Sequence, residues 1–185
     1  MLDTAPPGNS CTCCADLLAH RFGRRMFFGM AGGAALAAAL PRQAFAAESH
    51  YEAMLLNCID PRFPEPTIVY MRKRELSGKY SQFVMAGASI GVVAPAFAEW
   101  APAFWGNLKA SIALHHIPKV IVLNHRDCGA AKIAYGADAV KDPATETATH
   151  KAALMAFRAE LARRHPDLKA ETGLMALDGS VEMFA

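Results

Sequence analysis

The sequence predicts an α/β fold with a mostly parallel central sheet flanked by helices. Short apolar runs that read as strands alternate with segments that read as helices. One run, residues 119–124, is a continuous Val/Ile/Leu stretch that suits a strand buried on both faces. At 185 residues the chain is long enough for one domain and hardly for two, and its 53% hydrophobic content is that of a core-forming chain.

The expected elements follow one another without repeats or low-complexity linkers. They are a strand at 53–57, a helix at about 67–76, a strand at 82–86, a helix at 102–116, a strand at 119–124, a helix at about 145–164 and a hairpin within 171–184. Pro61, Pro64 and Pro66 exclude continuation of the first strand. Trp105, Leu108 and Ile112 fall on one helix face, and Asp178-Gly179 is the hairpin turn signal.

Residues 1–46 are interpreted as an export signal of the twin-arginine kind. Arg24-Arg25 precedes a weakly apolar run, which ends before the small-residue triplet Ala44-Phe45-Ala46. That run is shorter than the ~18–20 residues of a membrane span, so no stable span is expected after processing. The alternatives are a membrane anchor or a buried helix. Cleavage near Ala46 would leave 47–185 as a single zinc-binding catalytic domain, periplasmic or exported, after transient contact with the twin-arginine machinery.

Removal of this leader changes both the charge and the cysteine content. Four of the 19 basic and two of the 17 acidic residues lie within 1–46, so 15 of each remain and the net charge of +2 disappears. No basic patch is left, and no nucleic-acid partner is expected. Cys11, Cys13 and Cys14 are lost with the leader. Cys58 and Cys128 remain, and they could form a disulfide or bind a metal.

Cys58 and His125 each follow a predicted strand, and Cys128 follows three residues after His125. Ligand sites in open α/β sheets lie at the carboxyl ends of parallel strands, so these three residues can meet. Sulfur and nitrogen donors favour one zinc ion per chain. Three protein ligands leave a fourth position for water, and a helix beginning near Ala130 favours thiolate at Cys128. Taken singly, each could instead be a buried apolar cysteine or a polar cap.

Asp60 and Arg62 are interpreted as the catalytic pair of this site. Asp60 can occupy the fourth metal position in a resting form or accept a proton there, and Arg62 decides between these by binding the carboxylate bidentately. A solvated ion pair is the alternative. Asp127 is assigned no role, since an ion pair with Arg126 is an equal possibility. His115 and His116 are expected to cap a helix, with proton shuttling as the lesser alternative.

The motifs Cys58-x-Asp60-x-Arg62 and His125-x-x-Cys128-Gly129 resemble those of the β-class carbonic anhydrases. The likeness covers about residues 52–184. It implies that Cys58, His125 and Cys128 bind zinc and that Arg62 holds Asp60 away from the metal. It also implies that Asp60 orients a zinc-bound hydroxide for the reversible hydration of carbon dioxide to bicarbonate. A homodimer or a higher even assembly is implied as well.

Departures from the family pattern keep other functions open. Val84-Met85 stands where the family has Arg-Asn, and Pro61 stands where a small polar residue is usual. Cleavage at Ala46 would leave too few residues for the family's N-terminal arm, whereas residues 12–40, if retained, could supply it; this is the main alternative to a signal peptide. One alternative is a hydrolase of carbonyl sulfide or carbon disulfide, which the apolar surroundings of Met85 would tolerate. The other is a non-catalytic zinc-binding module, against which an intact Asp60–Arg62 pair argues.

Overall fold

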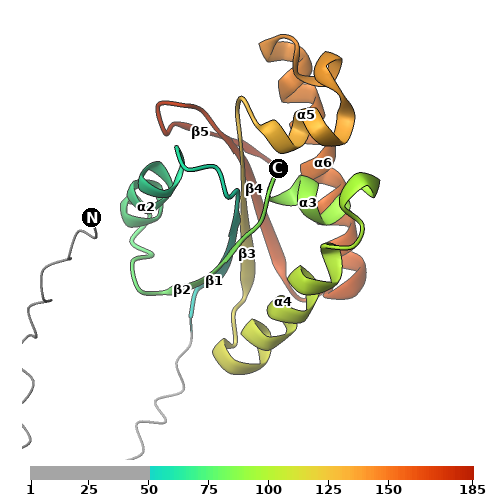
Figure 1. Cartoon of the computed structure of the whole chain (residues 1–185). Helices are drawn as coiled ribbons and strands as arrows, with labels where there is room; N and C mark the ends of the chain where they lie inside the picture. Colours follow the sequence, from blue (N-terminus) through green and yellow to red (C-terminus); the bar gives the residue numbers. More distant parts are fainter. Residues whose placement is uncertain (1–50) are drawn as a thin grey trace, which may run out of the picture. The chain divides into compact units, whose positions relative to one another are not determined.

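The computed structural model describes residues 51–185 (Figure 1), so the interpretation of residues 1–46 as a signal lies outside the described part. The strands are β1 (Ala53–Asn57), β2 (Tyr80–Val84), β3 (Lys119–His125), β4 (Lys169–Met175) and β5 (Val181–Phe184). The helices are α2 (Pro64–Lys73), α3 (Ser89–Val93), α4 (Ala101–His115), α5 (Gly129–Tyr135) and α6 (Pro143–Arg164), with short 3₁₀ turns η3 (Pro95–Phe97) and η4 (Ala137–Val140).

The five strands form one sheet in the order β2-β1-β3-β4-β5. β1 pairs in parallel with β2 and β3, and β3 pairs in parallel with β4. Only β5 among these strands runs antiparallel, because it returns from β4 through the Asp178-Gly179 turn. The predicted α/β class with a mostly parallel sheet is confirmed. The Val/Ile/Leu run of β3 lies near the middle of the sheet, where both of its faces are covered.

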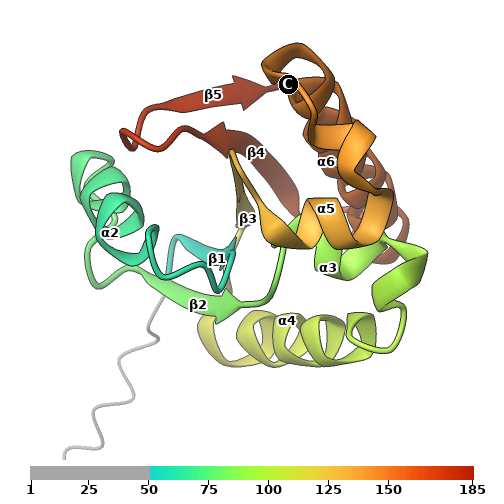
Figure 2. The same ribbon diagram turned by 45° about the horizontal axis from the view of Figure 1, so that its top comes forward.

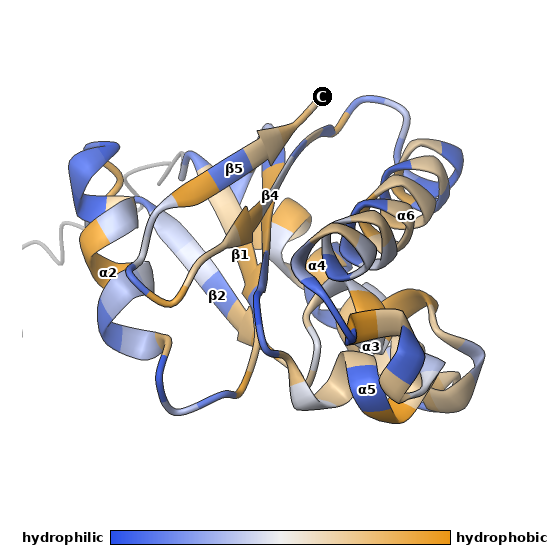
Figure 3. Cartoon of the chain, turned by 90° about the horizontal axis from the view of Figure 1, so that it is seen from above, coloured by the Kyte–Doolittle hydropathy of each residue, from blue (hydrophilic) through white to orange (hydrophobic). Residues whose placement is uncertain are grey.

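Helices cover both faces of this sheet (Figures 1 and 2). Helix α2 packs on one face, where Met71 meets Leu55 and Ile121. The other face carries α3, α4 and α6, whose core side chains include Phe104 and Phe157. Along α6, hydrophilic and hydrophobic residues alternate, as expected for a helix with one buried side (Figure 3). Within residues 51–185, no helix has the length and apolarity that crossing a membrane requires.

Three elements differ from the sequence expectation. Helix α2 begins at Pro64, three residues early, because prolines at 64 and 66 fit a first turn that needs no backbone N–H donors. Strand β2 lies two residues earlier than expected. On α4, Leu108 is buried as predicted, but the buried face is completed by Phe104, with Trp105 half-buried beside it. The face is therefore rotated by about one residue.

The loop after β2 turns directly into the short helix α3, which the sequence did not predict. Gly87 (φ +75°) and Ala88 (φ +49°) both take positive φ values in this turn. Gly91 follows inside α3, where an added Cβ would lie 2.5 Å from the Ala86 carbonyl oxygen. Glycine is thus required at 91 by close backbone approach rather than by turn geometry.

Candidate metal centre

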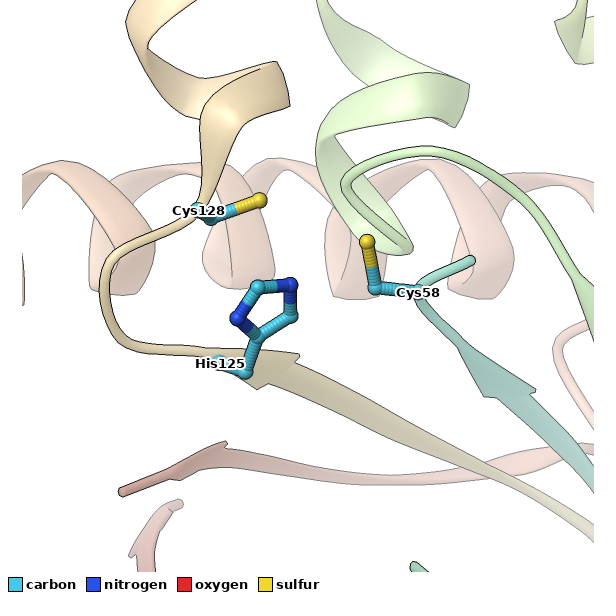
Figure 4. Close-up of side chains that lie close together, drawn as sticks. All are labelled: Cys58, His125 and Cys128. Carbon is cyan, nitrogen blue, oxygen red and sulfur yellow. The ribbon is translucent and has the colours of Figure 1, made fainter. Parts of the chain in front are cut away.

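Three soft donors converge at the carboxyl end of the sheet. Cys58 follows β1, His125 is the last residue of β3, and Cys128 immediately precedes α5. Their ligand atoms all lie within 4.8 Å of one another, and Figure 4 shows the three side chains directed toward a shared space. All three residues are buried, with at most 6% of their surface exposed. The predicted meeting of residues far apart in the sequence is confirmed, and the group could hold a metal ion.

Hydrogen bonds orient the imidazole for this role. His125 Nδ1 lies 2.8 Å from the Arg126 carbonyl oxygen, which can only accept, so Nδ1 carries the proton. The remaining nitrogen, Nε2, is buried and has no hydrogen-bond partner among the described residues. The ring of Phe63 packs on the imidazole with 4.0 Å between ring centroids. A buried nitrogen lone pair without a donor fits a metal ligand.

The two cysteine sulfurs interact, and the interaction shifts their pKa values in opposite directions. A hydrogen bond from the Cys128 thiol is the main cause that holds the pKa of Cys58 well below its usual range, and His125 and the Gly87 amide add to it. Gly87 N donates to Cys58 Sγ over 3.2 Å. The same thiol hydrogen bond raises the pKa of Cys128, which outweighs the N–H groups of α5. The expected effect of the helix start on Cys128 is thus present, through the N–H groups of Ala130 and Ala131, but it is the smaller one.

The charge on Cys58 also acts on His125. Burial by itself lowers the pKa of His125, but the nearby Cys58 sulfur with its negative charge, and the Arg126 carbonyl, raise it overall. Neither cysteine is in a disulfide, so the disulfide alternative is not what the structure contains. Two sulfurs and an imidazole in a dry site thus form a donor set whose negative charge a cation would balance.

Arg62 holds Asp60 bidentately beside these donors, as the sequence predicted. Arg62 Nε donates to Asp60 Oδ1 over 2.9 Å and Nη2 donates to Oδ2 over 2.7 Å. The Arg62 backbone N–H also donates to Oδ1. These hydrogen bonds from Arg62 lower the pKa of Asp60 to about 2, so its carboxylate is ionised across the physiological range. Asp60 accordingly is oriented toward the guanidinium.

Arg62 also binds a second carboxylate, that of Asp127, which the sequence did not predict. Arg62 Nη1 donates to Asp127 Oδ2 over 2.7 Å, and Nη2 donates to the Asp127 carbonyl oxygen over 3.0 Å. The expected alternative, an ion pair between Asp127 and its neighbour Arg126, does not form. Arg126 instead pairs with Glu146 of α6, whose other oxygen accepts the Asp127 N–H over 2.6 Å. Arg62 therefore joins the loop after β1 to the loop after β3.

The two histidines at the end of α4 lie near the amino ends of the strands, opposite the metal centre. Helix α4 ends at His115, just before β3 begins, whereas the metal centre lies where β3 ends. A strand of seven residues spans ~20 Å. The His115 ring packs against Tyr51, with 4.7 Å between centroids, and His116 terminates the helix in the left-handed conformation. A direct proton shuttle by either residue does not fit this placement.

Comparison with known structures places the fold among β-carbonic anhydrases. The chain resembles a tetrameric β-carbonic anhydrase from the ascomycete Sordaria macrospora with a TM-score of 0.53, 14% identity and coverage of 88% of this chain and 98% of that one. It resembles the wild-type β-carbonic anhydrase CafD of the fungus Aspergillus fumigatus with a TM-score of 0.50 and 7% identity, over 77% and 94% of the two chains. At such identities, the likeness establishes the fold alone.

Sequence comparison gives the family. The chain is 32% identical over 131 residues to an uncharacterized protein of Rickettsia conorii, covering 71% of this chain and 70% of that protein. It is 30% identical over 131 residues to an uncharacterized protein of Rickettsia bellii, covering 71% and 80%. The chain belongs to the same family as these two proteins. No family model matches it.

We predict that the full chain binds one zinc ion and that Cys58→Ser and Cys128→Ser each abolish stoichiometric binding. Each substitution removes one of the three donors that converge in the structure. Metal analysis of the purified proteins measures this. A Cys11→Ser/Cys13→Ser/Cys14→Ser variant is the matched control, and it should keep the metal. Zinc retained without Cys58 but lost in the control would contradict the assignment.

Proposed function

We propose that this protein is a zinc-dependent carbonic anhydrase, which interconverts carbon dioxide and bicarbonate. The observation that carries the proposal is the convergence of Cys58, His125 and Cys128 beside a carboxylate that a guanidinium holds. A set of two sulfurs and one imidazole favours zinc over oxygen-preferring ions such as magnesium and calcium. The likeness of the fold to β-carbonic anhydrases supports the same conclusion.

Cys58, His125 and Cys128 would hold the ion, and three ligands fit a catalytic rather than a closed structural site. When bound, zinc supplies the Lewis acidity that lowers the pKa of a water molecule to about 7. The orientation of the His125 ring supports this role. His125 is held through Nδ1 by a backbone carbonyl, so that Nε2 faces the sulfurs as the ligand nitrogen.

Asp60 would act as the hydrogen-bond acceptor that orients the reacting water. Its carboxylate is ionised, and both oxygens are tied to Arg62, which keeps it turned from the fourth metal position. This arrangement supports the open form over the form in which Asp60 is itself a ligand. Ile59, which directly follows Cys58 and is 61% exposed, supplies apolar surface suited to a small uncharged substrate.

We also propose that residues 1–46 direct export by the twin-arginine route and that the protein acts in the periplasm or outside the cell. The paired arginines and the small-residue triplet support this. A homodimer or higher even assembly is proposed as well. Strand β2 is an edge of the sheet, and Val84 at its end is 47% exposed, which leaves an edge available to a second copy.

Stopped-flow kinetics on the zinc-loaded full chain tests the proposal. We expect carbon dioxide hydration at about pH 7–9 that scales with bound zinc, because zinc-bound water ionises near pH 7. Zinc without hydration, but with turnover of carbonyl sulfide or carbon disulfide, would replace the proposal by a hydrolase on the same site. Met85 does not favour that outcome, since it is buried in the core with Phe104. Bound zinc without turnover of any of these substrates would indicate a non-catalytic zinc-binding module.

Asp60→Asn should lower the hydration rate by about 10²–10⁴-fold, because the amide cannot serve as the ionised acceptor. Zinc content should stay near one per chain, since Asp60 is outside the three-donor set. Asp138→Asn is the matched control, because Asp138 is an exposed acid on η4. Rates and metal content are measured together. A wild-type rate in Asp60→Asn would remove Asp60 from the mechanism.

Asp127→Asn should lower the rate less than about tenfold, and Arg62→Lys should lower it more. Asp127 is an exposed partner of Arg62 with a side chain 73% accessible, and such pairs contribute only about 0–1 kcal/mol. Lysine cannot reproduce the bidentate contact with Asp60. The order of the two rates is the readout. A large loss in Asp127→Asn together with a wild-type rate in Asp60→Asn would identify Asp127 as the acceptor instead.

A further inference from the structure

A buried polar triad lies directly behind the metal centre. Asn124 of β3, Ser89 of α3 and His150 of α6 are each at most 1% exposed. Asn124 immediately precedes His125, and successive residues of a strand point to opposite faces. His125 packs on Phe63 on the α2 side, while Asn124 contacts the helices on the other side. The triad therefore connects the histidine strand to two helices of the opposite layer.

The hydrogen bonds of the triad have one consistent direction. Ser89 donates to Asn124 Oδ1 twice, from its backbone N over 3.1 Å and from Oγ over 2.9 Å. Because a backbone N–H can only donate, the orientation of the Asn124 amide follows, and Nδ2 donates to His150 Nδ1 over 3.1 Å. His150 then carries its proton on Nε2. Burial, with smaller effects of His125 and Arg126, lowers the pKa of His150 to about 4, so the ring is neutral.

This triad is a poor device for stability alone. His150 Nε2 is buried and has no hydrogen-bond partner among the described residues. A buried donor without an acceptor destabilises the folded state, whereas apolar side chains of similar size carry no such penalty. Ile90 and Ala153, close in sequence to Ser89 and His150, belong to the apolar cluster that also contains Cys58 and Cys128. The three polar residues are therefore candidates for a role beyond core packing.

The backbone between Ser89 and Cys58 supplies that role. Gly87, two residues before Ser89, donates its N–H to Cys58 Sγ. Between them, Ala88 is fully buried with φ +49° and ψ −111°, a conformation that non-glycine residues rarely adopt. Such a turn persists only when its surroundings hold it. The two hydrogen bonds from Ser89 to Asn124 hold its far end.

We propose that Asn124 is a positioning residue for the metal centre. Braced by His150, it fixes the turn formed by residues 87–89 so that the Gly87 N–H stays directed at the Cys58 sulfur. A donor aimed at a thiolate stabilises its charge and sets its orientation toward a metal. The inference rests on the proposed zinc site, and it adds residues that touch neither the metal nor the substrate.

Zinc affinity by chelator competition tests this proposal on the full chain. Asn124→Leu should weaken zinc binding by about 10–100-fold, the usual effect of losing a partner of a metal ligand. Ser89→Ala removes only the hydroxyl donor and keeps the backbone one, so it should weaken binding by less than Asn124→Leu. The cobalt-loaded proteins give a second readout, because the thiolate-to-cobalt absorption band should shift in both variants.

Ser111→Ala is the matched control. It removes another buried serine hydroxyl, which lies 2.7 Å from Ser81 Oγ, on a helix that supplies no metal ligand. Its zinc affinity and cobalt band should match the wild type even where its unfolding temperature falls. Should Asn124→Leu fail to fold, Ser89→Ala decides the matter alone.

Wild-type affinity and an unshifted cobalt band in folded Asn124→Leu or in Ser89→Ala would overturn the proposal and leave the triad a structural feature. A wild-type chain that binds no zinc would instead overturn the proposed function, and this inference with it. The two failures are thus distinguishable by the wild-type measurement.

Discussion

The parallel pairing of β1 with β3 is the constraint on which the site depends. Asn57 lies opposite Leu123 in this pairing, so the carboxyl ends of both strands lie side by side and bring Cys58 and His125 together. The apolar core beneath them keeps water out. Two sulfurs and an imidazole brought together in such surroundings compete for protons. Placing these three groups together is energetically unfavourable, and a bound cation that replaces the protons would offset this cost.

The exposed part of the site follows a different principle. Asp60 and Arg62 form a partly solvated pair, and an isolated pair of this kind contributes little to stability. Its value lies in geometry, because the planar guanidinium holds Asp60 and Asp127 at once and thereby ties the two ligand-bearing loops together. Glu146 extends this connection to α6 through the Asp127 N–H. The three buried donors and the partly exposed Asp60 carboxylate are thus held in place by separate sets of contacts.

Local patterns in the sequence were sufficient to predict most of the fold and the three metal-binding donors. Cys58 and His125 could be placed because each follows an apolar run, and parallel strands bring such positions together. Asp127 and Glu146 could not, since their contacts depend on a loop with positive φ at Asp127 and on where α6 begins. The same holds for Asn124, whose importance depends on the unexpected helix α3. Contacts between elements distant in sequence have no local signature.

X-ray absorption spectroscopy at the zinc edge of the loaded full chain tests the central claim most directly. The account predicts two sulfur neighbours at ~2.3 Å and one imidazole nitrogen at ~2.0–2.1 Å, with one further light atom completing a tetrahedral site. That pattern would mean that Cys58, Cys128 and His125 bind one ion and leave a position for water. A shell made only of nitrogen and oxygen neighbours, or one with fewer than two sulfurs, would contradict it.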